Sequence, residues 1–168
     1  MARIVDSFLG ELEQEAATTR RVLERVPGDK LSWKPHTKSM SLGQLAMHVA
    51  TTPGGVAQIL ANDTFEMPSF EQPTAKSAAE LIPALEESVR TARQVVGSFD
   101  DQKAMGNWKL VQNGKELMVA PRVALLRSIM LNHWYHHRGQ LSVYLRLLNV
   151  AVPSIYGPSA DENPFSAA

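Results

Sequence analysis

The chain has 168 residues, of which 44% are apolar and 20% charged, the size and balance of a single globular domain spanning residues 1–168. Basic and acidic residues are equal in number, which argues against nucleic acid or an anionic membrane as a partner. The absence of cysteine excludes disulfides, thiolate zinc ligands and a cysteine nucleophile. Acidic residues near the N-terminus do not fit a signal peptide, and no apolar run reaches the ~20 residues of a membrane span, so we expect a cytoplasmic protein.

Hydrophobic periodicity predicts four long helices, and hence an all-α fold of the four-helix-bundle type. Apolar residues recur at helical spacing over residues 3–26, until Pro27-Gly28-Asp29 ends the first helix. The second helix is predicted from Ser41, whose hydroxyl is placed to form a capping box with Gln44, three positions later. This helix is expected to reach about Ala61.

A proline and a long connection mark the middle of the chain. Pro53, followed by two glycines, stands inside the second predicted helix, and because proline lacks a backbone donor we expect a kink or an interruption one turn beyond His48. Residues 62–76 contain Pro68 and Pro73 and are predicted to form a long connection. A connection of this length can cross the end of a bundle, so the second and third helices are predicted to run parallel.

The third helix is predicted to open at Ser77, with Glu80 completing a second capping box. After it, Asn113-Gly114 supplies the positive φ angles of a tight turn, so a small β-hairpin is expected between the third and fourth helices. The fourth helix is predicted from about Pro121 to about Leu148. The segment 152–161 is rich in proline and glycine and is expected to lie over the bundle without regular structure.

Three histidines are the candidate metal ligands. His133 and His137 are four residues apart, a spacing that places both imidazoles on one face of a helix. The apolar pattern predicts that the pair lies at the centre of the core-facing stripe, where ring nitrogens need partners. A third ligand is then required, and His48 is the best remaining candidate, because His36 lies in a loop beside a proline and His136 falls at the edge of the stripe.

The spacing alone leaves two interpretations open. A pair of histidines at i and i+4 recurs by chance, and the glutamate of the zincin motif is absent here, so both rings are equally well explained as structural groups bonded to carbonyls or carboxylates. A single histidine beside an apolar face, such as His48, is more often structural than a ligand.

Several polar residues surround the predicted ligands. Gln44 precedes His48 by about one turn and Gln140 follows His137 by three residues, so both amides are placed to orient a ligand or a bound water, and His136 is a candidate for the same role. Arg138 is expected to point away from the metal and to form a salt bridge with a neighbouring helix or the tail. Two residues of the tail would close the site or form an interface if the tail folds back: Tyr156 and Asp161.

Four segments together resemble one known family: residues 33–35, residues 39–48, residues 133–140 and residues 155–161. With these segments the chain resembles, over most of its length, the DinB-like superfamily of four-helix-bundle metalloproteins, which includes bacterial thiol-dependent transferases. The resemblance implies an up-down-down-up bundle with a long crossover between the second and third helices. It also implies a divalent ion, usually nickel or zinc, held by His48, His133 and His137.

The resemblance also implies a chemistry. Three imidazoles leave coordination positions open to water or substrate, as in a catalytic rather than a closed structural site. Transferase members of the family activate a low-molecular-weight thiol, which would have to be a cosubstrate here because the chain has no cysteine. The predicted function is therefore a metal-dependent thiol S-transferase, or else a hydrolase, acting on a small electrophilic substrate. A non-catalytic metal-stabilised bundle is the alternative, no catalytic residue is assigned, and a homodimer is expected because apolar bundles often pair.

Overall fold

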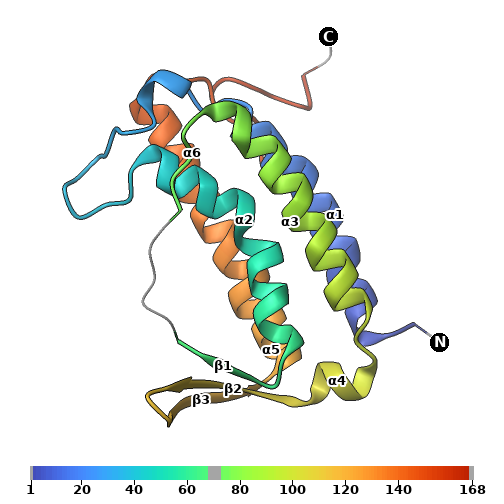
Figure 1. Ribbon diagram of the computed structural model, residues 1–168. Coiled ribbons are helices and arrows are strands. Elements are labelled where there is room, and N and C mark those ends of the chain that lie inside the picture. The colour runs from blue at the N-terminus through green and yellow to red at the C-terminus, as the bar shows by residue number, and fades with distance from the viewer. Residues whose placement is uncertain (1, 68–72, 167–168) are drawn as a thin grey trace.

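The computed structural model describes residues 2–67 and 73–166 (Figure 1). The fold is mostly helical, with a small three-stranded sheet at one end of the helices. The predicted helical fold with a small β-hairpin between the third and fourth helices is thus confirmed in its coarse form. Within the described ranges, no helix combines the length and the hydropathy needed to cross a bilayer.

Long helical segments make up most of the molecule (Figure 1). They are α1 (Ile4–Leu23), α2 (Leu42–Ala61), α3 (Leu81–Gly97), and a continuous run of α5 (Arg122–Leu125), a π-helical segment (Leu126–Asn132) and α6 (His133–Leu147). Short turns of 3₁₀-helix lie at Gly28–Lys30 and Ala78–Glu80, and α4 (Asp101–Met105) is a brief helix after α3. The first predicted helix thus ends three residues early, and the fourth is confirmed in extent.

Contacts between side chains give the directions of the helices. Arg3, before α1, donates to the Gly97 carbonyl at the end of α3, so α1 and α3 are antiparallel. Residues of α2 between 51 and 58 and residues of α3 between 84 and 91 line one groove, and the Gly54 amide of α2 donates to Ser88 Oγ of α3. In Figure 1 both run towards the sheet, whereas α6 runs away from it.

The two predicted helix starts have different outcomes. At α2 the capping box is confirmed, because Ser41 Oγ accepts from the Gln44 amide at 3.2 Å and Gln44 Oε1 accepts from the Ser41 amide at 2.9 Å. At α3 the predicted box is wrong. The Ser77 hydroxyl makes no capping bond, and the Glu80 carboxylate accepts from the Lys76 amide, since a 3₁₀ turn precedes the helix and shifts its start to Leu81.

The sheet has the strand order β1-β2-β3 and covers one end of the helices. Strands β2 (Asn107–Gln112) and β3 (Lys115–Pro121) form the predicted hairpin, with Asn113 at φ 51° and Gly114 at φ 74° in its turn. Strand β1 (Thr64–Glu66) pairs parallel to β2 and was not predicted, because three residues are too few to show an alternating pattern. The rest of the predicted connection includes residues 68–72, which lie outside the described part of the chain.

Of the predicted kink or interruption at Pro53, the interruption is wrong, since α2 continues through Pro53 to Ala61. Proline cannot donate to the carbonyl of Val49, four residues earlier, and the indole Nε1 of Trp134 donates to that oxygen instead at 2.7 Å. The next amide, of Gly54, donates to Ser88 Oγ at 2.8 Å. A Cβ on Gly54 would lie 2.8 Å from the backbone of Ser88, so a side chain there would push α3 away. The proline thus leaves the Val49 carbonyl to Trp134 of α6, and the glycine after it allows the close contact with α3.

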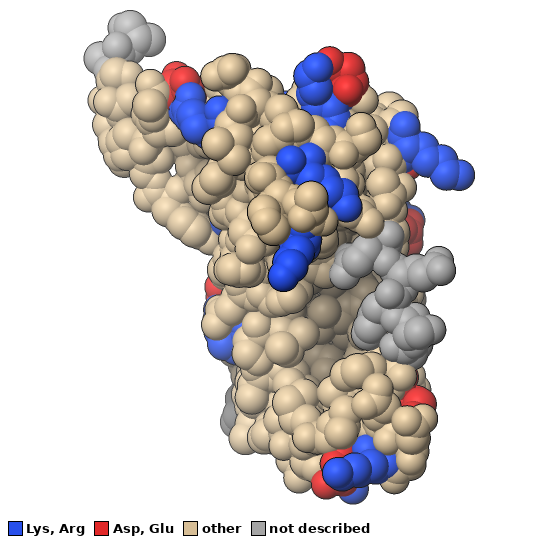
Figure 2. Space-filling model, turned by 90° about the vertical axis from the view of Figure 1, so that its left-hand side faces the viewer, with Lys and Arg blue, Asp and Glu red and all other residues tan. Residues whose placement is uncertain are grey.

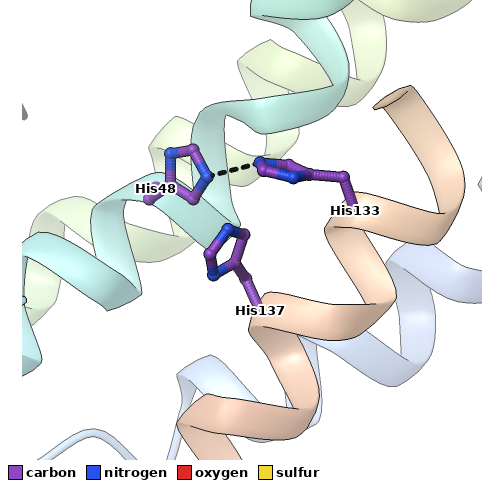
Figure 3. Close-up of side chains that lie close together, drawn as sticks. All are labelled: His48, His133 and His137. Atoms are coloured by element: carbon purple, nitrogen blue, oxygen red, sulfur yellow. Dashed lines mark hydrogen bonds between the residues drawn. The ribbon is translucent and has the colours of Figure 1, made fainter. Parts of the chain in front are cut away.

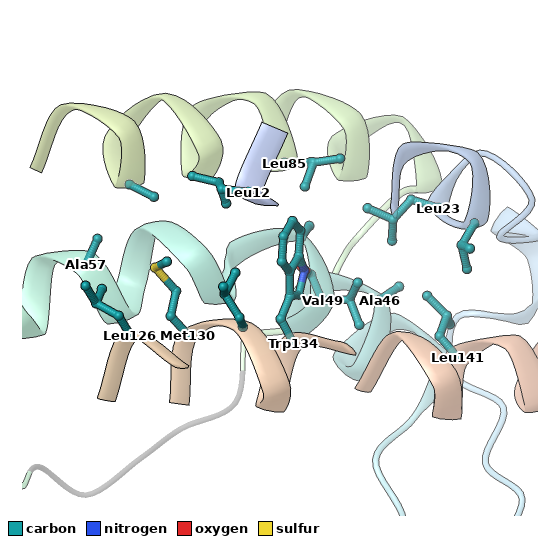
Figure 4. Close-up of a cluster of buried hydrophobic side chains, with 14 of the residues drawn as sticks. Leu12, Leu23, Ala46, Val49, Ala57, Leu85, Leu126, Met130, Trp134 and Leu141 are labelled. Atoms are coloured by element: carbon teal, nitrogen blue, oxygen red, sulfur yellow. The ribbon is translucent and has the colours of Figure 1, made fainter. Parts of the chain in front are cut away.

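The core lies between the long helices and receives side chains from each of them (Figure 4). Fully burying a large apolar side chain contributes about 1.5–3 kcal/mol, so this cluster is the main source of stability. Representative members are Leu12, Leu23, Ala46, Val49, Ala57, Leu85, Leu126, Met130, Trp134 and Leu141.

Arg122 joins the end of α2 to the sheet. Its side chain is buried, and its guanidinium donates to the carbonyls of Leu60 and Asn62 at the end of α2 and to those of Gly106 and Asn107 at the start of β2. One arginine side chain thus bonds to carbonyls both at a helix end and at a strand start. It fixes the start of the helical run that carries His133.

Candidate metal centre

Three histidines converge between α2 and α6 (Figure 3). His48 lies on α2, and His133 and His137 lie on the first turns of α6. One ring nitrogen from each lies within 4.8 Å of the other two. The Nε2 atoms of His48 and His133 are 3.0 Å apart, and the three ring centroids are 4.4 to 5.2 Å from one another.

These separations suit a shared cation. Imidazole nitrogens bind zinc at 2.0–2.1 Å, so two of them on one tetrahedral ion are about 3.4 Å apart. The separations between the ring nitrogens extend to both sides of that value. The Nε2 atoms of His48 and His133 are 3.0 Å apart, and all three nitrogens lie within 4.8 Å of one another. The donor set therefore fits a divalent metal that accepts nitrogen ligands.

The π-helical segment decides which face of α6 carries the histidines. The sequence pattern predicted His133 and His137 at the centre of the core face, but Trp134 and Arg138 occupy that place and the histidines are only partly buried. A π-turn closes i to i+5 bonds and so holds one residue more than an α-turn, which rotates everything after it by about 100°. The prediction is corrected by one residue: the rings lie beside the core and face α2.

Trp134 holds α2 and α6 together at the histidines. It is fully buried, and its bond to the Val49 carbonyl joins the residues that directly follow His133 and His48 in the sequence. The bond therefore fixes the separation of the two backbones where the rings meet. This role of Trp134 was not predicted; the available signal was Pro53, which deprives the Val49 carbonyl of its helical donor.

The polar neighbours of the rings have distinct roles. Gln140 Oε1 is 2.7 Å from His137 Nδ1, and an amide oxygen only accepts, so Nδ1 carries the proton and Nε2 presents its lone pair. Gln44 uses its amide oxygen in the cap of α2, so that oxygen is not free to orient a ligand. His136 is exposed and stands beside His137, with 5.0 Å between the ring centroids.

Electrostatics keep the three imidazoles neutral. Burial, reinforced by the nearby His137 and His133, lowers the pKa of His48 to about 4. Burial also lowers the pKa of His133 and that of His137, the second against the opposing effect of the Gln140 bond. Neutral imidazole is the form that binds a metal, so the site is ready for a cation at neutral pH.

Arg138 and the tail act on the other side of α6. As predicted, Arg138 points away from the histidines and forms a salt bridge, here a buried one to Glu15 of α1 at 2.6 Å. The Tyr156 hydroxyl bonds to both members of this pair. Asp161 accepts from the Val152 amide and pairs with Arg146, which holds the tail against α6. The described contacts of Tyr156 and Asp161 thus fasten the tail to helices, away from the candidate metal centre.

A helical fold of this kind, with histidines converging from two helices, matches a known family. The family model described as "DinB family" matches residues 1–164, and the chain belongs to this family.

Relatives extend the comparison. The chain is 27% identical over 165 residues to the uncharacterized protein YrdA of Bacillus subtilis (strain 168), covering 96% of this chain and 93% of that protein. Its fold is similar to that of a DinB-like protein from Bacillus cereus ATCC 10987, with a TM-score of 0.71, 23% identity and coverage of 93% and 100% of the two chains. A second structure, the DinB-like protein YjoA of Bacillus subtilis, gives a TM-score of 0.66 at 17% identity, with 94% and 99% covered.

Proposed function

We propose that this DinB-family protein binds one divalent metal ion through His48, His133 and His137 and uses it as an enzyme on a small electrophilic substrate. The observation that carries the proposal is the convergence of three neutral ring nitrogens from α2 and α6 on one point. We also assign the fold to the up-down-down-up four-helix bundles, because α2 and α3 run parallel and α1 and α6 run opposite to them.

The donor atoms narrow the choice of ion. A set of imidazoles without carboxylates or thiolates favours zinc or nickel over magnesium or calcium, which prefer oxygen ligands. When bound, such an ion supplies Lewis acidity and lowers the pKa of a coordinated water or thiol. The protein contributes the positions of the ligands: Gln140 orients His137, and Trp134 sets the spacing of the helices.

The thiol S-transferase reaction is the activity that we favour. The chain has no cysteine, so the reacting thiol comes with a low-molecular-weight cosubstrate. In the reaction, the thiol sulfur forms a bond to the electrophilic carbon, the leaving group departs with its electron pair, and the thiol proton passes to solvent. Hydrolysis of a small ester would use the same centre with water as the nucleophile.

The alternative function is a metal-stabilised bundle without catalysis. An ion held between α2 and α6 binds only the folded chain, so it would raise the free energy of unfolding by about 4 kcal/mol at a concentration one thousand times its dissociation constant. This function needs the same three histidines but no substrate.

Metal removal and restoration separates these functions. The protein is stripped with a chelator, reloaded with zinc or nickel, and assayed with small thiols plus 1-chloro-2,4-dinitrobenzene, and with 4-nitrophenyl acetate. We expect turnover that needs the metal, is lost in His133→Ala and persists in His136→Ala, whose ring lies on the exposed flank. If reloading raises only the melting temperature while no substrate turns over, the protein is the metal-stabilised bundle.

A further inference from the structure

A concavity of about 180 Å³, separate from the candidate metal centre, lies between the sheet and the helices. Its floor is a row of side chains that crosses all three strands, because Phe65 of β1 pairs with Leu110 of β2, which pairs with Met118 of β3. Val56 of α2 and Ile129 of the π-helical segment form its walls. We refer to it as the sheet pocket.

The sheet pocket is apolar throughout. Among the described residues, none of those that line it is charged. Trp108 is the lining residue with a polar atom, and its indole N–H is occupied by the carbonyl of Ile59 at 3.1 Å. Its ring lies nearly parallel to that of Phe65, with 6.4 Å between the centroids, so the pocket presents aromatic surface. In Figure 2 the surface is hollowed between the helical part and the sheet end, and the visible walls of this hollow are free of charged side chains.

Solvent reaches this apolar surface, although burial would be favourable. Ile129 is 43% exposed and Met118 is 36% exposed. Apolar side chains gathered in a concavity, rather than scattered singly, are the usual property of a small-molecule site. A cavity of about 150 Å³ holds a benzene molecule, so this pocket has room for a single ring but not for a helix of another protein.

The sheet pocket and the histidines open on the same side of the α2 and α6 pair. On α2, Val56 and Ile59 follow His48 by 8 and 11 residues, which places them about 12–16 Å further along the helix axis. Viewed down the helix axis, both side chains leave the helix within about 80° of the direction of the His48 side chain. On the other helix, Ile129 precedes His133 by about one turn. A molecule on the order of 12 Å long, with several bonds between its ring and its reactive end, is therefore needed to span the distance from the rings to the pocket.

We propose that the sheet pocket binds an uncharged apolar group about the size of one ring, carried by the small molecule whose reactive end meets the histidines. This inference rests on the proposed function for the reactive end and names the class of substrate: an electrophile or ester with an aryl or branched alkyl substituent. The absence of charged lining residues selects against an anionic or cationic substituent, which would lose its hydration without gaining a partner.

The test uses toluene as the probe and the full chain without added metal, because the carboxylate of the charged comparison would otherwise bind the ion. Backbone amide signals are followed by NMR during titration, with benzoate as the charged comparison. We expect saturable shifts confined to residues around the pocket, and binding of benzoate at least about tenfold weaker, equivalent to about 1.4 kcal/mol. Toluene that gives no saturable shifts, or that binds no better than benzoate, would overturn the inference.

Two variants locate the binding. Val56→Phe fills the pocket from α2, and Ile129→Asn places an amide in its wall at a position that is already exposed. Each should weaken toluene binding about tenfold or more. Val143→Asn makes a similar change at a site on α6 that is 56% exposed and outside the pocket, and should leave binding unchanged. Equal affinity in wild type and both pocket variants would place the toluene elsewhere.

The result of the toluene titration does not depend on whether the proposed function is right. Toluene binding requires neither the ion nor turnover, so loss of metal uptake in His133→Ala leaves the pocket measurement intact. Conversely, a pocket that fails to bind toluene leaves the metal assay unaffected.

Discussion

At the scale of single residues, the candidate metal centre depends on side chains that hold the histidines in place. His137 is oriented by Gln140, which accepts from its Nδ1 and leaves Nε2 facing His48 and His133. Partners of this kind fix the tautomer and raise the basicity of a ligand. His136 and Gln44, which also lie near the ligands in sequence, are engaged elsewhere or exposed.

Substituting Gln140 by alanine should weaken metal affinity about 10- to 100-fold, because His137 loses the acceptor that fixes its ring. Gln140→Glu keeps an acceptor at the same place and should retain most of the affinity. Competition with a chromophoric chelator measures both. Gln94→Ala, an exposed glutamine on α3, is the matched control. An unchanged dissociation constant in Gln140→Ala would show that His137 is positioned without it.

At the scale of elements, irregularities in two helices bring the histidines together. Pro53 frees the Val49 carbonyl on α2, and the π-helical segment turns Trp134 inward to take it. The same rotation moves His133 and His137 off the core face and towards α2. A regular α-helix over residues 122–147 would place the histidines where Trp134 and Arg138 now lie.

A double-mutant cycle tests this link. Trp134→Phe keeps an aromatic ring but removes the donor to Val49, and should lower the free energy of unfolding by about 1–3 kcal/mol. In that background, Pro53→Ala restores a helical donor to the same carbonyl, so part of the loss should be recovered. Urea denaturation of the four proteins gives the coupling, expected to exceed about 0.5 kcal/mol. Strictly additive effects would mean that Pro53 and Trp134 act independently.

Local sequence signals predicted some elements and missed others for physical reasons. The Ser41 and Gln44 cap, the Asn113-Gly114 turn and the i, i+4 histidines are short-range patterns, and the structure contains all of them. The π-helical segment has no such signal, because its extra residue is stabilised by tertiary packing, so the core face of α6 was predicted one residue off. Strand β1 exists only through pairing with β2, more than 40 positions away in the sequence.

At the scale of the whole molecule, the candidate metal centre influences the stability of the fold. Desolvation of ring nitrogens between α2 and α6 is unfavourable unless they gain a partner. Without metal, a proton is the species that competes for the ring nitrogens. Because the pKa of His48 is lowered, protonation of this ring is unfavourable in the folded chain. Protonation and metal binding should therefore have opposite effects on folding.

The metal-free protein should lose stability as the pH falls from about 6.5 to about 4. The unfolded chain binds a proton at His48 with the ordinary pKa of 6.5, whereas the folded chain binds it at about 4. Between these values the unfolded state holds more protons, so the free energy of unfolding decreases with falling pH. Urea midpoints from pH 8 to 4 should fall more steeply in wild type than in His48→Gln, in which other titrating groups are unchanged. Parallel curves would contradict the lowered pKa.

The central claim is that three imidazoles from two helices bind one cation, and metal stoichiometry tests it most directly. Elemental analysis after reloading with zinc or nickel and gel filtration should find a single ion per chain in wild type and in His136→Ala. His48→Ala, His133→Ala and His137→Ala should each lose stoichiometric uptake while remaining helical by circular dichroism. Full occupancy in any of these three variants, or no bound ion in wild type, would contradict the account.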